Sequence, residues 1–516
     1  MNKFMTADEA VKLVQDYDSV AVSGNGGGIM EPNFLFEALE KRFLETGHPT
    51  NLTLTHSAGI GDKENGGVSR FAHEGMIKRV VGGHWGWSPR MQRLANENKI
   101  EAYNFPQGIV AMQYREVAAH RVGLITKTGL GTFVDPRISG AKLNDFTKEE
   151  LVEIVEMNGE EWLHYKTYPF HIALIRGSYA DAEGNVSMEQ EPAYLEALQI
   201  AQAVHNCGGK VIVQVKYPAK NGSMDPKNVR IPGILVDAVV VCPGQMQTIE
   251  GEYNPALTGE LKLPEDSIVP MKLDQRKVVA RRAAMEMRRG MVMNLGFGMP
   301  DGVAKVAAEE NISDYAKMTI EQGIVGGIPA SGAIFGVAYN AEAMIDGPSQ
   351  FDFYNGGGLD MTCLGLAQAD SHGNVNVSKF GPTISGAGGF IDISQTAKKC
   401  VFCGTFTAAG LKVQIEDGKL KILQEGRVKK FVKDVEHITF SGDFARKTHQ
   451  AVLYVTERAV FEMTPEGLVL KEIAPGVDLQ RDILDQMEFM PLMPQEPKLM
   501  DLRIFKDEKM GLRTQD

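Results

Sequence analysis

Apolar residues follow two alternating patterns along this chain: short, mainly apolar runs, and longer stretches in which they recur at helical spacing. The mainly apolar runs at residues 19–22, 211–215 and 234–241, the last broken by Asp237, predict strands, and the spaced pattern at residues 34–44 predicts a helix. Strands and helices alternate in this way along the whole chain. The pattern therefore predicts α/β domains with largely parallel sheets.

The first half opens with an ordered series of helix, strand, glycine loop and helix. Thr6 and Glu9 have the spacing of a capping box at the start of the first helix. A short strand at residues 19–22 leads into a glycine loop at residues 24–28. Pro32 then stands where proline is favoured, at the first position of the next helix.

The same series recurs in the second half of the chain. Asp274 caps a predicted helix that Gly290 ends, and a strand at residues 291–295 follows. Residues 296–299 form the glycine loop, after which Pro300 begins the next helix. The chain therefore reads as one unit written twice.

A second pair of similar segments supports this duplication and helps to place the domains. Residues 180–186, ADAEGNV, resemble residues 369–375, ADSHGNV. The echo lies farther from the glycine loop in the first copy than in the second, which predicts an insertion at about residues 60–170. A chain of 516 residues is too long for one core. We predict two related open-sheet α/β domains, residues 1–270 and 271–516, with the boundary near residues 267–273.

Composition fits an ordinary globular protein, with 43% hydrophobic and 23% charged residues and a formal net charge of -12. The acidic balance argues against nucleic-acid binding, which needs a basic face. The chain has no apolar run of about 18 residues such as a membrane span needs, and its N-terminal segment lacks the apolar core of a signal peptide. We therefore expect a cytoplasmic protein that binds neither nucleic acid nor a membrane.

The five cysteines, an odd number in a large chain, predict reduced thiols and a cytosolic setting. Cys400 and Cys403 have the spacing of half a zinc site, but no second cysteine pair accompanies them. They lie in a strand-like run, where residues three apart point to opposite faces. We expect buried thiols and no metal site.

Glu321 is the most informative single residue, because an apolar strand there runs into a glycine-rich turn, MTIEQGIVGG at residues 318–327. In open α/β sheets ligands bind just beyond the carboxyl ends of strands, so this carboxylate is placed to do chemistry. The corresponding strand of the first copy, residues 52–55, is followed by His56 and has no carboxylate. A merely structural acid would be expected in both copies. The alternative interpretation is a solvated turn residue.

The loop that contains Gly26, Gly27 and Gly28 resembles a dinucleotide fingerprint. That motif needs an acid at the end of the next strand, and the strand before His56 offers none. Glycine-rich loops also let backbone amides approach an anionic oxygen. We therefore favour a carboxylate or an oxyanion over a dinucleotide as the guest of this loop.

Two further glycine loops could carry an extended ligand. The first has free amides at a helix N-terminus, which can bind phosphate or pyrophosphate. In the second, no side chain blocks the approach of a ligand to the backbone. The alternative for the first loop is a tight strand-to-helix turn. The first loop comprises Gly296, Phe297, Gly298, Met299 and Pro300, and the second comprises Gly386, Ala387, Gly388 and Gly389.

Gln107 lies in a Pro-Gln-Gly turn that would hold its amide rigidly, so it could donate to a carbonyl oxygen that becomes negative. The alternative is a surface glutamine. His56, His84 and His372 could act as bases, but the chain has neither a Gly-x-Ser-x-Gly elbow nor a His-Glu-x-x-His motif, and we favour structural roles for them. The segment GGHWGW around His84 either lines an acyl pocket or packs the insertion.

Taken in order, these motifs resemble those of the class I coenzyme A transferases, especially the bacterial acetate/propionate (short-chain acyl) enzymes with fused alpha and beta halves. The resemblance runs almost from end to end and implies tandem alpha-type and beta-type domains with the active site between them. Its segments are GNGGGIMEP from Gly24, YNFPQG from Tyr103, GLGTFVDPR from Gly129, NLGFGMPDG from Asn294, EQGIVGG from Glu321, QFDFYNGGGLD from Gln350 and SGAGGFIDIS from Ser385.

The resemblance implies a ping-pong transfer of coenzyme A between an acyl-CoA and a short-chain carboxylic acid. Glu321 would attack the thioester carbonyl to give an acyl-glutamyl anhydride, and the released CoA thiolate would convert this to a glutamyl-CoA thioester and a free acid. An incoming carboxylate would reverse the sequence. The resemblance also implies that coenzyme A is a substrate, that no cofactor is needed, and that the enzyme is a homo-oligomer, a dimer or a tetramer.

The same resemblance assigns roles to the loops. Gln107 would help to form the oxyanion site, and Gly26, Gly27 and Gly28 would border the acyl or carboxylate pocket. The loops at residues 296–300 and 386–389 would carry coenzyme A. Many relatives have Ser or Asn after the catalytic glutamate, whereas this chain has Gln322, and the role of that side chain is left open.

Two other functions remain open at this point. An acyl-CoA hydrolase would use the same glutamate with water as the acceptor. A ligand-sensing α/β module would be expected to carry a basic helix-turn-helix, which this sequence does not supply. The acyl group is not readable either, because one methylene in a pocket is worth only about 1–3 kcal/mol; acetate, propionate, butyrate, lactate and acetoacetate all fit.

Overall fold

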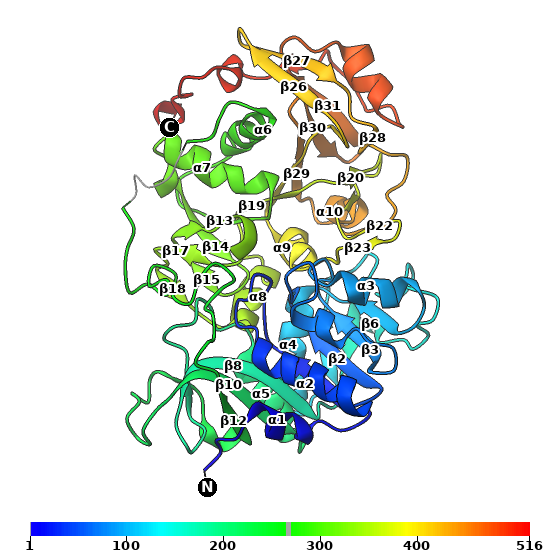
Figure 1. Cartoon of the computed structure of the whole chain (residues 1–516). Helices are drawn as coiled ribbons and strands as arrows, with labels where there is room; N and C mark the ends of the chain where they lie inside the picture. The colour runs from blue at the N-terminus through cyan, green and yellow to red at the C-terminus, as the bar shows by residue number, and fades with distance from the viewer. Residues whose placement is uncertain (1, 265–269, 516) are drawn as a thin grey trace. The chain divides into compact units, whose positions relative to one another are not determined.

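The structure is a computed structural model that describes residues 2–264 and 270–515. It divides into two compact units that interleave along the chain, whereas the sequence predicts one cut after residue 270 (Figure 1). Part of the predicted boundary, residues 267–269, lies outside the described residues. The first unit comprises Met1–Lys262, Glu321–Asp352 and Gly381–Asp392, and the second comprises Leu263–Ile320, Phe353–Phe380 and Ile393–Asp516.

A mainly parallel sheet forms the framework of the first unit, with β1 (Ser19–Val22) at its centre. β1 pairs in parallel with β2 (Leu52–His56) on one side and with β8 (Ile172–Ala180) on the other. All four residues of β1 are buried, as expected of a strand covered on both faces. The sheet continues through β3 (Ile77–Gly82), β4 (Glu101–Asn104), β9 (Val186–Ser187), β10 (Lys210–Pro218), β11 (Val229–Ile231) and β12 (Ala238–Val241).

Helices cover this sheet and supply its core. Leu35, Phe36 and Leu39 are fully buried in one hydrophobic cluster with Val22 and Leu54 from the strands. Two other helices pack against each other, and the second of them also packs on β8 and β10. The helices are α1 (Ala7–Ala10), α2 (Asn33–Thr46) and α3 (Pro89–Asn96) in the first cluster, with α4 (Gln107–Ala118) and α5 (Ala197–Asn206) as the packed pair.

The predicted insertion at residues 60–170 contains β3, β4 and a separate antiparallel sheet. That sheet has the order β5 (Gly123–Thr126), β7 (Glu160–Lys166), β6 (Val152–Met157). Short antiparallel pairs mark the later segment of the first unit. They are β15 (Ile324–Val325) with β18 (Ala343–Met344), and β16 (Ile328–Pro329) with β17 (Ala338–Tyr339).

The second unit has a sheet of the same design, centred on β13 (Met291–Leu295). β13 pairs in parallel with β14 (Ala316–Ile320) and with β19 (Met361–Gly365). Helices α6 (Gln275–Ala284) and α7 (Gly302–Glu309) contribute buried residues to its core. Its other elements are β24 (Lys399–Cys403), β29 (Ala451–Val455), β30 (Ala459–Thr464), β31 (Gly467–Ile473) and β32 (Lys498–Leu499) in the same sheet, with β20 (Gln368–Ala369), β21 (Val375–Asn376), β22 (Lys379–Phe380), β25 (Thr407–Ala408), β26 (Lys412–Glu416), β27 (Lys419–Gln424), β28 (Val428–Lys429) and α10 (Gly442–Lys447) outside it.

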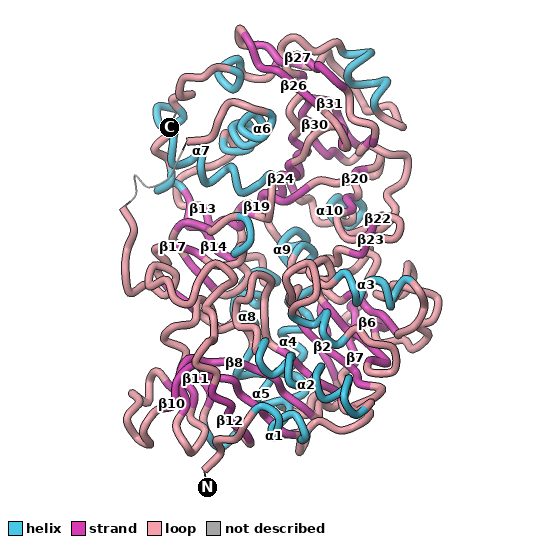
Figure 2. Tube along the Cα trace, in the orientation of Figure 1, coloured by secondary structure: helices cyan, strands magenta, loops and turns pink. Residues whose placement is uncertain are grey.

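Strand order confirms that the two open sheets are related. The run β2-β1-β8-β10-β12 in the first unit is parallel throughout, and β14-β13-β19-β24-β29 repeats it in the second. Figure 2 distinguishes strands from helices by colour. Three further elements lie at the changes between units: β23 (Thr383–Ile384), α8 (Gly347–Asn355) and α9 (Phe390–Thr396).

The echoed sequences at residues 180–186 and 369–375 fold into the same turn. The carboxylate of Asp181 accepts the N–H groups of two following residues at 3.0 Å, and the carboxylate of Asp370 does the same. Asn185 Oδ1 then accepts the N–H of Gly233 at 2.9 Å, and the matching Asn374 accepts the N–H of Gly442 at 2.9 Å. Identical side-chain caps at both sites agree with the predicted duplication.

Helix caps were readable from the sequence, but several element boundaries were not. The capping box of Thr6 and Glu9 is present, and Asp274 caps α6 by accepting the N–H of Lys277 at 3.0 Å. Pro32 is the N-cap of α2 and not its first residue. Pro300 lies in a 3-10 turn, so α7 begins only at Gly302.

One predicted strand and one predicted helix are shorter than the sequence suggested. Of residues 234–241 only β12 is a strand, because Gly233–Leu235 form a 3-10 turn. The helix that starts after Asp274 ends at Ala284, six residues before Gly290. Both predictions followed the apolar pattern, which continues through turns that are buried for other reasons.

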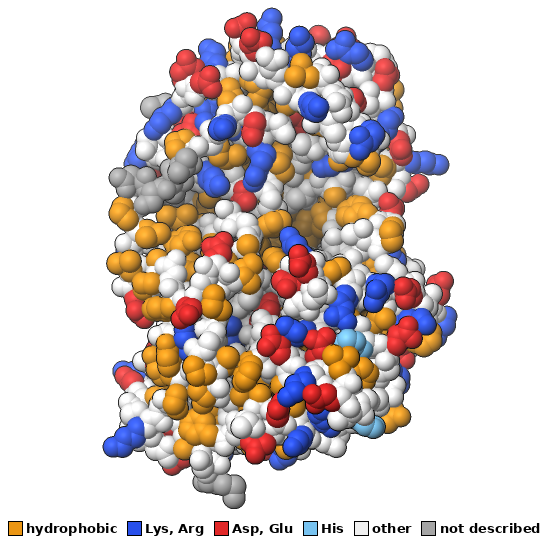
Figure 3. Space-filling view, viewed as in Figure 1, with side chains coloured by type: hydrophobic (Ala, Val, Ile, Leu, Met, Phe, Trp, Pro, Cys, Tyr) orange, Lys and Arg blue, Asp and Glu red, His pale blue; other side chains and the backbone are white. Residues whose placement is uncertain are grey.

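Cys400 and Cys403 are buried in β24, and all five cysteines are free thiols. Over the described residues no cluster of three or more His, Cys, Asp or Glu side chains could hold a metal ion. In the same residues no helix combines the length and hydropathy needed to cross a membrane. Charges of both signs are interspersed over the face drawn in Figure 3.

Candidate active site

Glu321 occupies the position that the sequence predicted, directly after β14 at the carboxyl end of a parallel strand. It is the first residue of the segment that belongs to the first unit, and only 8% of it is exposed. The turn that follows depends on Gly323, whose φ is +97° and where a Cβ would overlap the carbonyl oxygen of Ile345. The carboxylate is thus presented by a turn that only glycine can form.

The side chain of Gln322 joins this turn to the first glycine loop. Gln322 is 2% exposed, and its Nε2 donates to Oδ1 of Asn25 at 3.0 Å. Asn25 Nδ2 in turn donates to the carbonyl oxygen of Phe335 at 3.1 Å. The residue next to Glu321 therefore fixes the distance between the carboxylate-bearing turn and the loop that contains Gly26, Gly27 and Gly28.

The first glycine loop is a closed turn with an aromatic ring packed against it. Asn25 and Ile29 exchange backbone hydrogen bonds of 2.8 and 3.1 Å. A Cβ at Gly26 would overlap the indole of Trp87, and one at Gly27 would overlap the carbonyl oxygen of Ala333. The glycines are therefore needed for close approach of neighbouring groups, and Trp87 forms a wall beside the loop.

A buried ion pair holds the backbone at the end of the first glycine loop. Arg176 on β8 donates to the carbonyl oxygen of Gly28 at 3.0 Å and to that of Glu31 at 3.2 Å. Its guanidinium also binds Glu191 through two hydrogen bonds of 3.1 and 2.7 Å. Arg176 and Glu191 are each 2% exposed. The pair is thus fully desolvated and holds the backbone at the end of the glycine loop.

Two other carboxyl groups of the first unit, those of Glu31 and Glu196, are buried and have raised pKa values. Burial raises the pKa of Glu31 to about 7, although its Oε1 accepts the N–H of Gly61 at 2.9 Å. Burial likewise raises the pKa of Glu196 to about 7. Burial thus favours the neutral form of both carboxyls.

Gln107 is brought to the loop at residues 386–389. It is the first residue of α4, not part of an open turn, and its N–H donates to the carbonyl oxygen of Gly388 at 2.8 Å. The N–H of Gly388 donates to Gly83 at 2.8 Å, and Asn104 Oδ1 accepts the N–H of Ala387 at 2.8 Å. These contacts make the loop an integral part of the first unit, beside Gln107 and the GGHWGW segment.

The remaining predicted loop, residues 296–300, belongs to the second unit. Gly298 has a φ of +90° and open space where a Cβ would project. Its carbonyl oxygen accepts a 2.8 Å hydrogen bond from Arg276, which also pairs with Asp301 at 2.7 Å. Phe297 is 52% exposed. The loop is anchored at one carbonyl and leaves an apolar ring at the surface.

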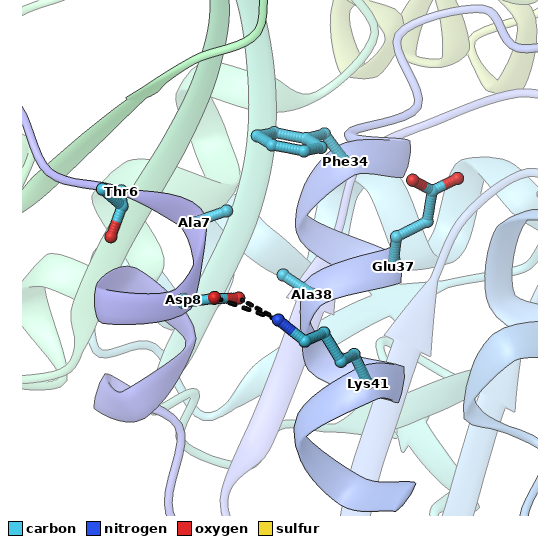
Figure 4. A pocket seen from close by; sticks show the side chains of 7 residues that line it. All are labelled: Thr6, Ala7, Asp8, Phe34, Glu37, Ala38 and Lys41. Carbon is cyan, nitrogen blue, oxygen red and sulfur yellow. Dashed lines mark hydrogen bonds and ion pairs between the residues drawn. The ribbon is translucent and has the colours of Figure 1, made fainter. Parts of the chain in front are cut away.

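A separate pocket between α1 and α2 has a different character (Figure 4). Lys41 points across it and pairs with Asp8 at 3.1 Å. Glu37, also in its lining, pairs with Arg70 at 2.7 Å. Its three charged side chains thus all have ion-pair partners, and we assign no ligand to the pocket.

Sequence reasoning found the carboxylate and the loops but missed the groups that hold them. Asn25, Trp87, Asn104 and Arg176 act through contacts that span large separations along the chain, such as 297 residues between Asn25 and Gln322. Only Trp87 had a local signal, since the GGHWGW segment was noticed as a candidate wall.

Comparisons with known proteins agree along nearly the whole chain. The family model described as Coenzyme A transferase matches residues 4–242. The acetate CoA-transferase YdiF of Escherichia coli (strain K12) is 50% identical over 508 residues, which cover 98% of this chain and 96% of that protein. The caffeate CoA-transferase of Acetobacterium woodii is 47% identical over 522 residues, which cover 100% of this chain and 99% of that protein.

Solved structures give the same result. The crystal structure of the acyl-CoA transferase (YdiF) apoenzyme from Escherichia coli O157:H7 is similar with a TM-score of 0.95 and 49% identity, covering 99% of this chain and 97% of that chain. A thioester complex of that enzyme with CoA is similar with a TM-score of 0.94 over the same shares of both chains.

Proposed function

The chain belongs to the coenzyme A transferase family, and we propose that it transfers coenzyme A through Glu321. As a member of that family it is an enzyme that moves coenzyme A between an acyl-CoA and a carboxylate. One observation carries the assignment of Glu321. It is a nearly buried carboxylate at a strand end, fixed through Gln322 to the glycine loop that could hold the reacting acyl group.

In the proposed reaction the carboxylate of Glu321 is the nucleophile. Glu321 attacks the thioester carbonyl, and the C–S bond breaks with its electron pair leaving on the CoA thiolate. The thiolate then attacks the glutamyl carbonyl of the anhydride and releases the acid, which leaves a glutamyl-CoA thioester. Holding the bound CoA in place makes these attacks intramolecular, which can supply about 7–11 kcal/mol of the barrier.

We assign to the surrounding residues the roles that the sequence suggested. Gln107 stabilises the carbonyl oxygen that becomes negative, and Gly26, Gly27 and Gly28 border the acyl pocket. The loops at residues 386–389 and 296–300 bind coenzyme A. Anchored backbone in these loops supports the proposal, because preorganised groups lose little freedom when the ligand binds.

A small carboxylic acid suits the wall beside the glycine loop. Trp87 packs directly on Gly26 and leaves that side of the loop closed. We therefore propose acetate, propionate or butyrate as the acid. A comparison of kcat/KM for these acids with that for caffeate tests the preference. Because the indole closes the pocket, we expect a lower kcat/KM for a bulky aromatic acid.

Three wider features are part of the same proposal. The nucleophile is supplied by the protein, so the enzyme needs no resident cofactor, and coenzyme A is a substrate. Five reduced thiols suit a cytoplasmic setting. The family resemblance supports a homo-oligomer, a dimer or a tetramer, which light scattering of the purified protein would identify.

Covalent labelling tests the central step. Incubation with propionyl-CoA alone, followed by borohydride, should reduce a thioester at Glu321 to the alcohol, with a loss of about fourteen mass units in the peptide that contains it. An unmodified Glu321 with steady release of CoA in the absence of an acceptor acid would instead indicate a hydrolase. No reaction with acetyl-CoA, propionyl-CoA or butyryl-CoA would contradict both enzyme functions.

The hydrogen bond between Gln322 and Asn25 should be measurable as an energetic coupling. We expect Gln322→Ala and Asn25→Ala each to slow formation of the glutamyl-CoA thioester, and the double variant to be little worse than either. A coupling of about 0.5–3 kcal/mol between the two changes is expected for residues in contact. Single-turnover rates with propionyl-CoA give the cycle.

A matched cycle of Gln322→Ala with Gln15→Ala, an exposed residue, supplies the control. That pair should be additive. Additive effects for Gln322 and Asn25 as well would mean that their hydrogen bond does not position Glu321.

A further inference from the structure

Four glycines lie close to His84. Cβ atoms at Gly59, Gly86, Gly386 and Gly388 would lie 2.6, 2.8, 2.9 and 3.4 Å from the nearest atoms of this histidine. The four glycines come from three segments of the first unit that are far apart in the sequence. Gly59, Gly86 and Gly388 lie against the imidazole and Gly386 lies against the backbone of His84, so this close packing restricts the orientation of the ring.

Hydrogen bonding determines which ring nitrogen carries the proton. The N–H of Gly86 donates to Nδ1 of His84 at 3.2 Å, so the neutral ring is protonated on Nε2. Burial, together with the smaller effects of His56 and Lys63, lowers the pKa of His84 to about 4. At neutral pH the ring is thus a neutral N–H donor and a weak base. No described residue hydrogen-bonds to Nε2, and the side chain remains partly exposed.

The neighbours of the ring belong to the candidate site. A Cβ at Gly388 would lie 3.4 Å from Cδ2 of His84 and 3.8 Å from Oε1 of Gln107. On its other side the ring shares contact with Gly59 and Trp87, and Trp87 packs on Gly26. His84 therefore lies between the glutamine assigned to the oxyanion and the wall of the acyl pocket.

We propose that Nε2–H of His84 is a second oxyanion donor, acting with Gln107 on the carbonyl oxygen of the acyl or glutamyl group. This inference rests on the proposed function. When the carboxylate or the thiolate attacks, the carbonyl oxygen gains negative charge, and a preorganised neutral donor stabilises it without transferring a proton. The low basicity of this ring suits the task.

Two amide substitutions separate the proposed role from a structural one. In His84→Asn the side-chain oxygen can replace Nδ1 and keep the bond to Gly86, but the donor at the far end is lost. In His84→Gln the amide nitrogen reaches the place of Nε2 and keeps the donor. We expect kcat to fall by about 10²–10³-fold in His84→Asn and His84→Ala, and by less than about 10-fold in His84→Gln, with KM for the acyl-CoA little changed.

The outcomes distinguish this inference from the proposed function. Recovery of kcat by Asn and not by Gln would assign His84 to the support of Gly86 and overturn the proposal. Equal rates in all variants would overturn it as well. Thermal unfolding of each variant identifies a loss of fold, and borohydride labelling of Glu321 in the wild-type protein tests the proposed function independently of His84.

Discussion

Replacing Glu321 by alanine is expected to abolish coenzyme A transfer while leaving the fold intact. Without the carboxylate neither the anhydride nor the thioester can form, and loss of a nucleophile typically costs at least about 10⁴-fold in kcat. Glu321→Asp should retain slight activity, because the shorter side chain withdraws the carboxylate from the reacting carbon. Transfer of CoA from propionyl-CoA to acetate, followed by product chromatography, measures both variants.

The matched control is Glu45→Gln, which removes an exposed carboxylate at the end of α2 and should leave kcat unchanged. Borohydride should leave the peptide of Glu321→Ala unlabelled and label that of the control. Transfer by Glu321→Ala within about tenfold of the wild-type rate would show that another group is the nucleophile.

The largest effect on stability is expected from Arg176→Met. The substitution leaves Glu191 buried and without its guanidinium, and loss of one partner from a buried ion pair typically costs about 3–5 kcal/mol. It also removes the donors to the backbone at Gly28 and Glu31. We therefore expect a lower free energy of unfolding in urea together with slower thioester formation at Glu321.

Arg121→Met is the comparison for this change. Arg121 is 56% exposed and pairs with Glu116 at 2.7 Å, so its removal should cost no more than about 1 kcal/mol. If Arg176→Met also lowers the free energy of unfolding by no more than about 1 kcal/mol, Glu191 is accommodated without its guanidinium partner at little cost. Unchanged labelling of Glu321 would mean that the glycine loop keeps its form without Arg176.

Features encoded by neighbouring residues could be predicted from the sequence. The capping box of Thr6 and Glu9, the strands at residues 19–22 and 291–295, and the placement of Glu321 at a strand end all depend on a few adjacent positions. Each meets a local requirement that a few residues reveal. Examples are the unpaired N–H groups at a helix start, which a side chain caps, and the glycine-rich turn that follows a strand.

What the sequence could not reveal depends on contacts between distant segments. Nothing near Gln322 indicates that it meets Asn25, and nothing near Arg176 indicates that it supports Gly28. His84 was noticed in its segment, but its tautomer follows from a backbone N–H that only the folded chain aims at Nδ1. Such roles arise from tertiary packing, for which local pattern has no signal.

The return of residues 321–352 and 381–392 to the first unit has a consequence for how the protein must be made. A chain severed between Lys262 and Leu263 would leave Asn25 on one fragment and its partner Gln322 on the other. Each fragment would have to be produced in equal amount and find its complement before any turnover. Covalent continuity removes that search, because it guarantees one-to-one stoichiometry of the two halves from the moment of synthesis.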